Sequence, residues 1–335
     1  TWNPDRIKPM TPTASIPLID LSDADERIIP ELARALCDTG FVLVAGHGIP
    51  EALVSDLRHQ TVKYFARPLS EKLADSITAE NYRGYIPLGF FSPNASPQDT
   101  PTTPDQYEGY KLHFEVTADN AIRTACDLYG PNRWPANGAA LKAAVMAFWQ
   151  ACDQTGQQLL SLIARILGVD PVGFLSLFEY PLSNMTLLHY PPKSTASDNF
   201  GIHPHKDTDA LTLLFPDPVG GLWLHSRNTD TWLEVDAPLG TMVVNIGDLL
   251  ELWSGGLFVS TPHKVINASG EKRYSFPFFM VPRHDVVVEP LIPCQSGYHR
   301  DPIPVGAVSR EVWRTNWPDT TPSDSGFDLG TLADS

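Results

Sequence analysis

Two histidines and one aspartate in the second half of the chain could ligate a single metal ion. His205 and Asp207 are two residues apart, so on a strand their side chains would share one face. His263 could complete this triad from a distant strand. Two imidazoles and one carboxylate suit non-haem Fe(II) and leave positions for a substrate and O2, although Mn(II), Co(II), Ni(II) and Zn(II) accept the same donors. The spacing predicts a metal centre, and the first chemistry to consider is that of an oxygenase.

A second polar pair follows the triad. Arg273 and Ser275 are again two residues apart, so both would face the same side of one strand. A guanidinium beside a hydroxyl can hold the distal carboxylate of a dicarboxylic co-substrate. Tyr190 could reach the same carboxylate from a strand end, or it could be an ordinary packed aromatic residue. Arg273 alone would be interpreted as a surface residue, but together with the triad it predicts a co-substrate site.

Two other patterns compete with this ligand set. His203 has the same parity as His205, so a His203/His205 pair is a rival, and we prefer Asp207 because a carboxylate is expected for iron. His299-Arg300-Asp301 repeats the His-x-Asp spacing, but neither a further histidine nor an Arg-x-Ser pair follows it. We interpret that second pattern as chance.

The elements that must position these groups show a strand-like alternation from Met185 onward. Short strands at this spacing, separated by turns rich in glycine and proline, predict a sandwich or a jelly roll. The eight predicted strands are Met185–Tyr190, Ala210–Phe215, Leu222–His225, Thr231–Val235, Thr241–Ile246, Thr261–Asn267, Tyr274–Val281 and Val286–Glu289.

The first half of the chain shows mainly the period of amphipathic helices. Helices are predicted at 25–39, 51–65, 141–167 and, near the C-terminus, 305–317; short strands are predicted at 16–21 and 41–44, and loosely held ends at 1–15 and from Thr320. Little regular pattern appears over 81–116. The predicted fold class is mixed α/β with a β-rich core. We divide the chain into an N-terminal region (1–180), a core (181–290) and a C-terminal helix and tail (291–335), packed as one compact unit.

Composition and charge argue against several partners. The 335 residues include 24 Lys and Arg against 39 Asp and Glu, a net charge of −15, so we expect neither a nucleic acid nor an anionic membrane surface as partner. No apolar stretch approaches the roughly 20 residues of a membrane span. The four cysteines form no C-x-x-C pair, and with no visible signal peptide they predict free thiols and a cytoplasmic protein. Nothing in the sequence indicates the oligomeric state.

Several motifs together resemble the isopenicillin N synthase-like family of Fe(II)/2-oxoglutarate-dependent dioxygenases. The resemblance runs from about Ile16 to Trp317 and is far more specific than one His-x-Asp pair. Besides the triad and the Arg-x-Ser pair, it is carried by Ile16–Leu21, Gly40–Pro50, Leu187–Pro192, Gly220–Leu222, Val244–Asp248 and Ser260–Val265.

The resemblance implies a double-stranded β-helix, which is a cupin-like jelly roll, with flanking N-terminal and C-terminal helices. It implies Fe(II) at the triad and 2-oxoglutarate as co-substrate, with the distal carboxylate at Arg273 and Ser275 and with Tyr190 assisting. O2 would be the oxidant, and ascorbate an assay supplement. Many plant members carry Asn where this chain has Leu188, so the contacts of the proximal end of 2-oxoglutarate stay open.

The implied reaction is hydrogen abstraction from a small-molecule substrate by an iron-centred oxidant, with release of succinate and CO2. Hydroxylation, desaturation and ring rearrangement are its outcomes. Two alternatives stay open. One is an Fe(II) oxidase of the isopenicillin N synthase type that needs no 2-oxoglutarate. The other is a Zn(II) barrel that hydrolyses or merely binds a small ligand, against which Arg273 and Ser275 argue.

Five aromatic residues are predicted near the substrate. Phe279 follows Arg273 by six residues on the same predicted strand, so it would face the same side. The other four are expected at the mouth of the site, together with the loop 92–116: Tyr82, Tyr85, Phe200 and, on the C-terminal helix, Trp313. Ordinary core packing is the alternative for each. Aromatic side chains at a mouth suggest a small, partly apolar substrate such as a specialised metabolite.

Overall fold

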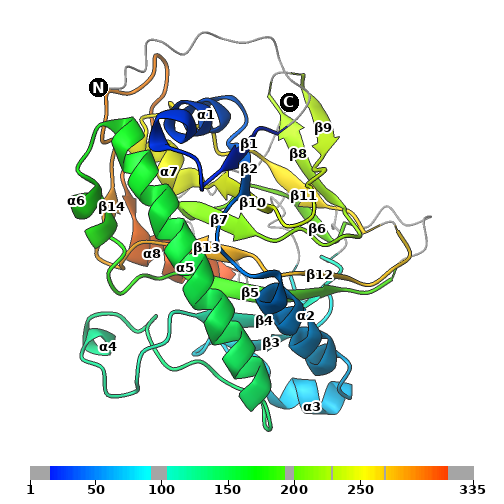
Figure 1. Ribbon diagram of the computed structural model, residues 1–335. Coiled ribbons are helices and arrows are strands. Elements are labelled where there is room, and N and C mark those ends of the chain that lie inside the picture. The colour runs from blue at the N-terminus through cyan, green and yellow to red at the C-terminus, as the bar shows by residue number, and fades with distance from the viewer. Residues whose placement is uncertain (1–15, 92–103, 193–199, 228, 268, 316–335) are drawn as a thin grey trace, which may run out of the picture.

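The computed structural model describes residues 16–91, 104–192, 200–227, 229–267 and 269–315. Both predicted loose ends, and the residues between 92 and 103, lie outside these ranges. Figure 1 shows two β-sheets at the centre, with helices around the larger one. The described chain is therefore mixed α/β with a β-rich core, as predicted.

The larger sheet has nine strands, and nearly all of its pairs are antiparallel. In spatial order its strands are β1 (Leu18–Asp20), β2 (Phe41–Ala45), β10 (Met242–Ile246), β7 (Leu211–Leu214), β13 (Phe278–Met280), β5 (Asn184–Tyr190), β4 (Glu108–His113) and β3 (Gly84–Ile86), with β12 (Arg273–Ser275) also paired to β5.

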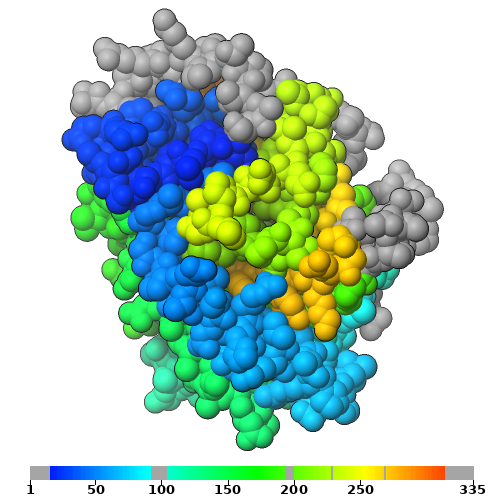
Figure 2. Space-filling model, turned by 45° about the vertical axis from the view of Figure 1, so that its right-hand side comes forward, coloured from blue at the N-terminus to red at the C-terminus, as the bar shows by residue number. Residues whose placement is uncertain are grey.

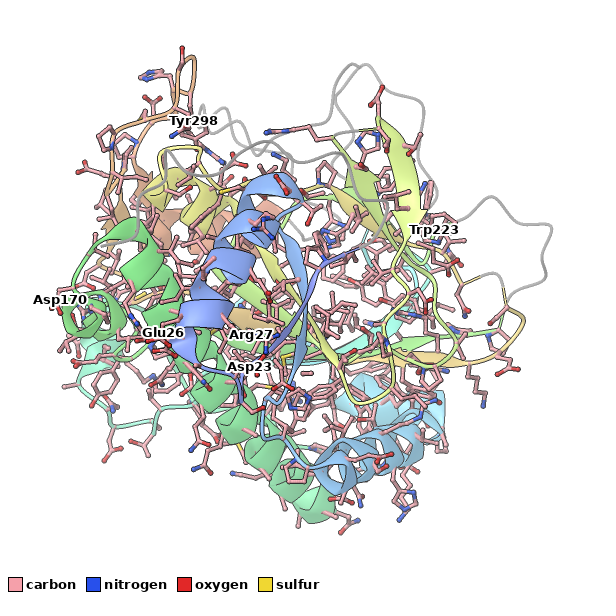
Figure 3. The ribbon with its side chains drawn as sticks, turned by 45° about the horizontal axis from the view of Figure 1, so that its top comes forward. Asp23, Glu26, Arg27, Asp170, Trp223 and Tyr298 are labelled. Carbon is pink, nitrogen blue, oxygen red and sulfur yellow. The ribbon has the colours of Figure 1, made fainter. Side chains whose placement is uncertain are left out.

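The smaller sheet has four strands, in the order β6 (Ile202–His205), β11 (His263–Val265), β8 (Leu222–Ser226) and β9 (Thr231–Glu234). In β8 the buried Leu222 and Leu224 alternate with Trp223, the residue labelled in Figure 3 on this sheet, which is less buried. A separate pair is formed by β14 (Val287–Val288) and β15 (Ile303–Pro304).

The two sheets pack against each other through one apolar cluster. Phe41, Leu214 and Val243 belong to the larger sheet, and Leu224 and Val265 to the smaller one. Two sheets facing each other in this way form the predicted jelly roll. We call the side of the larger sheet that faces the smaller one its inner face.

The helices cover the other side of the larger sheet and its ends. They are α1 (Asp25–Asp38), α2 (Glu51–Phe65), α3 (Leu69–Ala74), α4 (Ile122–Ala125), α5 (Ala139–Leu167), α6 (Pro171–Ser176), α7 (Asp248–Trp253) and α8 (Val305–Thr315). The long α5 crosses the outer face of the sheet (Figure 1) and buries residues such as Leu159 and Ile163 there. Gly168, with φ of +72°, ends it in the left-handed conformation. Asp170, labelled in Figure 3, caps α6 by accepting from Gly173 N at 2.9 Å.

The amphipathic α2 is tied to the strand that carries Arg273. Figure 2 shows α2, in blue, beside yellow-green segments from the second half of the chain. Arg58 of α2 donates to Asp217 Oδ2, and the same oxygen accepts from the backbone N–H of Tyr274 at 2.9 Å. This link holds β12 from the side opposite to the site.

Three predictions about elements need correction. The region 81–116, in which little pattern was expected, contains β3 and β4, and both are strands of the larger sheet. β6 was not predicted. The single strand expected at 274–281 is divided into β12 and β13, because Pro277 cannot donate a hydrogen bond to a sheet. The other predicted helices and strands of the described chain are present, within a few residues of their expected ends.

The larger sheet draws strands from both sides of residue 180, because β4 pairs with β5 along its length. The boundaries proposed at 180 and 290 stay predictions. The four cysteines, Cys37, Cys126, Cys152 and Cys294, are free thiols. None of the helices in the described ranges combines the length and the apolarity that crossing a bilayer requires.

Candidate active site

The three residues of the predicted triad lie together between the sheets. His205 ends β6 and is directly opposite His263 on β11, so their rings share one face, with centroids 4.3 Å apart. Asp207 follows two residues after the end of β6. Its Oδ1 lies 3.7 Å from His205 Nε2 and 3.6 Å from His263 Nε2. Two atoms that are each about 2 Å from one ion can be at most about 4 Å apart, so both distances fit a shared metal.

Each imidazole turns the correct nitrogen toward this shared point. His205 Nδ1 lies 2.7 Å from the carbonyl oxygen of His203, and His263 Nδ1 lies 3.3 Å from that of Thr261. A carbonyl oxygen only accepts, so Nδ1 carries the proton in both rings. The lone pair of each Nε2 is then free for a cation, an arrangement common among metal-binding histidines.

The carboxylate of Asp207 is oriented from the larger sheet. Its Oδ2 accepts from Thr212 Oγ1 at 2.5 Å and from Asn245 Nδ2 at 2.7 Å. These bonds fix one oxygen and leave Oδ1 directed at the two histidines. Thr212 and Asn245 are paired across β7 and β10, so both sit on the inner face. The carboxylate of Asp207 therefore links the histidines of the smaller sheet to Thr212 and Asn245 of the larger sheet.

A neighbouring carboxyl group, that of Asp209, contacts the same hydroxyl. Thr212 Oγ1 also lies 2.9 Å from Asp209 Oδ2, but a hydroxyl has only one proton to donate. With the Thr212 proton directed at Asp207, the short contact favours a protonated Asp209 that donates to Thr212. Burial, together with the charge of Asp207, raises the pKa of Asp209 well above its ordinary value, which agrees with this assignment.

The electrostatics of the triad favour cation binding. Burial lowers the pKa of His263 to about 4, so its imidazole is neutral at physiological pH. Burial alone would raise the pKa of Asp207, but His263, His205 and the two hydrogen bonds hold it below its usual value. Two neutral imidazoles and one ionised carboxylate are the donor set that Fe(II) accepts in non-haem oxygenases. The residues present thus fit the metal.

Arg273 offers a buried, unsatisfied donor on the same face. Its guanidinium carbon lies 4.8 Å from the centroid of the Tyr190 ring, and its Nε donates to the carbonyl oxygen of Gly220 at 2.7 Å. The side chain is almost fully buried, and its Nη1 has no hydrogen-bond partner among the described residues. A buried cationic donor without a partner is costly, so it fits an anion such as the carboxylate of 2-oxoglutarate.

The turn that supplies the Gly220 carbonyl requires glycine at the next position. Gly221 has φ of +87°, and a Cβ there would lie 2.3 Å from the carbonyl oxygen of Ile266. Ser275 is buried and pairs with Leu188 on β5, just as Arg273 pairs with Tyr190. All four side chains therefore share the inner face. The structure places the predicted co-substrate residues side by side, with Leu188 opposite Ser275 on the same face.

The rival ligand sets do not come together. His203 Nδ1 lies 2.6 Å from Asp105 Oδ1, and its ring contacts that of Phe200 at a tilt. Within the described ranges, the triad is the one group of three metal-binding side chains whose ligand atoms lie within 4.8 Å of one another. In the second His-x-Asp pattern, Arg300 donates to Asp248 at 2.8 Å, so this segment has a structural contact of its own.

Three of the five predicted substrate residues lie on or beside the inner face. Phe279 pairs with Thr212, so the parity argument holds across Pro277. Tyr82 belongs to the cluster between the sheets, and Trp313 packs on it with ring centroids 5.5 Å apart. Phe200 lies at the smaller sheet, just before β6, and its ring is tilted against that of His203 with centroids 4.8 Å apart. Their contact with a substrate stays a prediction.

Tyr85 is a correction. It pairs with Tyr110, whose neighbour Lys111 occupies the inner face, so Tyr85 faces the helices instead. Its hydroxyl donates to Glu108 Oε2 at 2.6 Å, and its ring packs against Tyr64 of α2. Alternation in an unrecognised strand therefore turns Tyr85 away from the site.

Sequence reasoning gave no role to Thr212, Asn245 or Lys111. Thr212 and Asn245 are single polar residues inside apolar strands, at Leu211–Leu214 and Met242–Ile246. A polar side chain in a strand that is buried on both faces needs a partner, and that signal could have found both. Lys111 lies in a strand that was not predicted.

Comparisons with known proteins agree with this geometry. Residues 181–282 match the family model of the 2OG-Fe(II) oxygenase superfamily, and residues 16–137 match that of the non-haem dioxygenase in morphine synthesis N-terminal region. The chain is 32% identical to the 2-oxoglutarate-Fe(II) type oxidoreductase hxnY of Emericella nidulans, over 85% of this chain and 84% of that protein. It is 31% identical to homoarginine-6-hydroxylase 2-ODD-C23 of Glycine max, over 84% and 89%.

Among solved structures, the chain resembles a full-length Neurospora crassa protein in complex with alpha-KG and thymine. The TM-score is 0.77 at 25% identity, and the match covers 90% of this chain and 97% of the Neurospora crassa chain. The matched relatives are similar to this chain over most of their own length. This chain belongs to the family of Fe(II)- and 2-oxoglutarate-dependent dioxygenases.

Proposed function

We propose that His205, Asp207 and His263 bind the Fe(II) of this dioxygenase, and that Arg273, Ser275 and Tyr190 hold the distal carboxylate of 2-oxoglutarate. The observation that carries the proposal is that the two carboxylate oxygens of Asp207 have different roles. Thr212 and Asn245 occupy Oδ2, which leaves Oδ1 within 3.7 Å of both imidazole Nε2 atoms. The unpartnered Nη1 of Arg273 supports the co-substrate assignment.

When bound, iron and 2-oxoglutarate together supply the oxidation of a substrate C–H bond by O2, with succinate and CO2 as co-products. The protein contributes orientation and exclusion of water. Phe41 packs edge-on against His263, with centroids 5.7 Å apart, and Val243 and Leu214 extend this apolar surface along the inner face. A low-dielectric surrounding strengthens the hold of Asp207 on a cation and of Arg273 on a carboxylate.

We infer that the substrate is a small molecule, and specialised metabolism is the setting we favour. Two matched proteins support a small substrate: one is named a homoarginine-6-hydroxylase, and the Neurospora crassa protein is solved with thymine. Phe279, Tyr82, Phe200 and Trp313 are the proposed contacts. Hydroxylation, desaturation and ring rearrangement are all compatible with this site. A cytoplasmic location and the lack of a nucleic-acid or membrane partner stay predictions from charge and composition.

An anaerobic titration tests the assignment of the site. The purified chain is loaded with Fe(II), 2-oxoglutarate is added, and the visible metal-to-ligand charge-transfer band is recorded. We expect the band in the wild type, no band in Asp207→Ala, and a band only at much higher 2-oxoglutarate concentration in Arg273→Ala. Bound iron without a band in the wild type would contradict the proposal and point to an oxidase that needs no 2-oxoglutarate.

A further inference from the structure

Lys111 places a cation on the inner face, beside the proposed active site. It lies on β4 and pairs with Thr186 of β5. Its Nζ donates to Asn184 Oδ1 at 2.6 Å and to Thr186 Oγ1 at 3.1 Å. Both acceptors are neutral. An ammonium has three N–H donors, so one of them is left for another group.

The position of this ammonium relative to the triad follows from the strand register. Nζ lies 5.2 Å from the centroid of the Phe279 ring. Phe279 pairs with Asn184 on one side and with Thr212 on the other, and Thr212 donates to Asp207. One aromatic residue therefore separates Lys111 from the side chain that holds the metal-binding carboxylate. A small molecule lying over Phe279 would reach both.

Lys111 has no carboxylate partner among the described residues. The charge of Asp207 acts on it electrostatically, but the hydrogen bonds of Lys111 go to Asn184 and Thr186 and not to a carboxylate. Lys72 shows how the same chain treats a lysine on the outer face of the sheet: its Nζ lies 2.6 Å from Glu108 Oε2. The buried Lys72 is thus paired with a carboxylate, whereas Lys111 is hydrogen-bonded only to neutral groups.

Lys111 is also partly accessible to solvent. Its side chain keeps intermediate solvent exposure, although its neighbours on both sides in β4 are buried. At the same time desolvation lowers its pKa to about 7. Burying the charged form of a lysine costs free energy, and an anion bound beside the ammonium offsets that cost.

We propose that Lys111 is a specificity-determining residue that binds the carboxylate of an acidic small-molecule substrate. Asn184 and Thr186 orient its ammonium, and Phe279 packs on the apolar part of the substrate. The substrate would span from Lys111 toward the triad, while Arg273 holds the co-substrate elsewhere on the inner face. This inference rests on the proposed function, because it takes the triad as the reacting centre.

Matched acids and amides test the proposal directly. The probes are 3-phenylpropionate and hexanoate, each compared with its primary amide, which keeps the shape and removes the charge. Binding to the full chain loaded with Mn(II) and 2-oxoglutarate is measured by calorimetry, so no turnover is needed. We expect each acid to bind about 10- to 100-fold more tightly than its amide in the wild type. Acid-stimulated succinate release by the Fe(II) enzyme gives a second readout.

Three variants separate specificity from structure. Lys111→Met keeps length and apolar volume, and we expect it to bind acid and amide equally. Lys111→Arg keeps the charge, and we expect it to retain a preference for the acid. Lys142 is an exposed lysine of α5 whose Nζ lies over the ring of Trp134. We expect Lys142→Met to behave as the wild type.

The proposal is overturned if neither acid binds, if acid and amide bind equally in the wild type, or if Lys111→Met keeps the preference. The charge-transfer band distinguishes this failure from failure of the proposed function. If both the wild type and Lys111→Met show the band but neither prefers the acid, the role of Lys111 is contradicted. The iron and 2-oxoglutarate assignments are then unaffected. Absence of the band in the wild type contradicts the proposed function itself.

Discussion

Thr212 Oγ1 lies 2.5 Å from Asp207 Oδ2. Thr212 belongs to the larger sheet, whereas Asp207 lies two residues beyond the end of β6 in the smaller sheet, so the larger sheet holds this carboxylate. Asp207 stands beyond the end of β6, and no ladder of backbone hydrogen bonds fixes its side chain. Its orientation depends on Thr212 and Asn245. The metal site is therefore a property of both sheets together.

Removal of the Thr212 hydroxyl is expected to weaken metal binding. In Thr212→Val the shape is kept, but Oδ2 of Asp207 loses one of its two donors, and we expect the Kd for Mn(II) to rise about 10- to 100-fold. Thr155→Val is the matched control. Thr155 is a buried threonine of α5 whose hydroxyl donates to the carbonyl oxygen of Ala151 at 3.0 Å. Equal metal affinity in the two variants would show that Thr212 does not orient the ligand.

Loss of any one triad residue is expected to abolish turnover while leaving the fold intact. His205→Ala, Asp207→Ala and His263→Ala each remove one of three protein ligands, so bound iron and succinate formation are both expected to fall to background. Circular dichroism and thermal unfolding report the fold. His225→Ala is the control, because His225 lies on β8 and pairs with Asp230 at 3.5 Å. A variant with full activity would exclude its residue from the site.

Arg273→Lys is expected to raise the KM for 2-oxoglutarate roughly 10- to 100-fold, because a lysine cannot reproduce the planar fork of donors. It also loses the bond from Nε to the Gly220 carbonyl and the stacking over Tyr190. Arg283→Lys is the control, since Arg283 pairs with Asp285 outside the site. Initial rates of succinate release at varied 2-oxoglutarate measure the effect. An unchanged KM would remove Arg273 from the co-substrate site.

The residues of the site could be predicted from their spacing, but the structural features that bring their side chains together could not. Strand alternation was expected to bring Asp207 beside His205, yet Asp207 is not in a strand. The alternation argument held better at the other end. Arg273 and Phe279 keep one register against β5 across Pro277, because Tyr190 and Asn184 are their partners. A proline interrupts the hydrogen bonds of a strand without changing which side chains share its face.

The strand that carries Lys111 was missed for a physical reason. A half-buried strand is recognised by apolar residues on one face and polar residues on the other. In β4 the polar residues fall on both faces: Lys111 is on the inner one, and Glu108 on the outer one, where Lys72 neutralises it. Neither partner can be read from the local sequence. The same omission hid β3 and led to the wrong orientation for Tyr85.

The pKa of Lys111 predicts a pH-dependent contribution to stability in the metal-free protein. Desolvation lowers this pKa to about 7 from 10.5, so between these values the unfolded chain binds more protons than the folded chain. The free energy of unfolding contributed by this residue therefore rises as the pH increases from about 7 to 10.5, and it levels off at its lowest value below about 7, where both states carry the proton. In Lys111→Met that dependence is absent.

Urea unfolding of the metal-free wild type and Lys111→Met at pH 6.5 and pH 9.5 measures this contribution. At pH 6.5 the wild type carries a crowded cation, so we expect Lys111→Met to be the more stable of the two. At pH 9.5 the amine is neutral in the folded state, and the difference is expected to shrink or reverse. Lys142→Met, an exposed lysine variant, controls for loss of surface charge. A difference between wild type and Lys111→Met that does not change with pH would mean that the ammonium is fully solvated, and the case for an anion beside it would lose its electrostatic support.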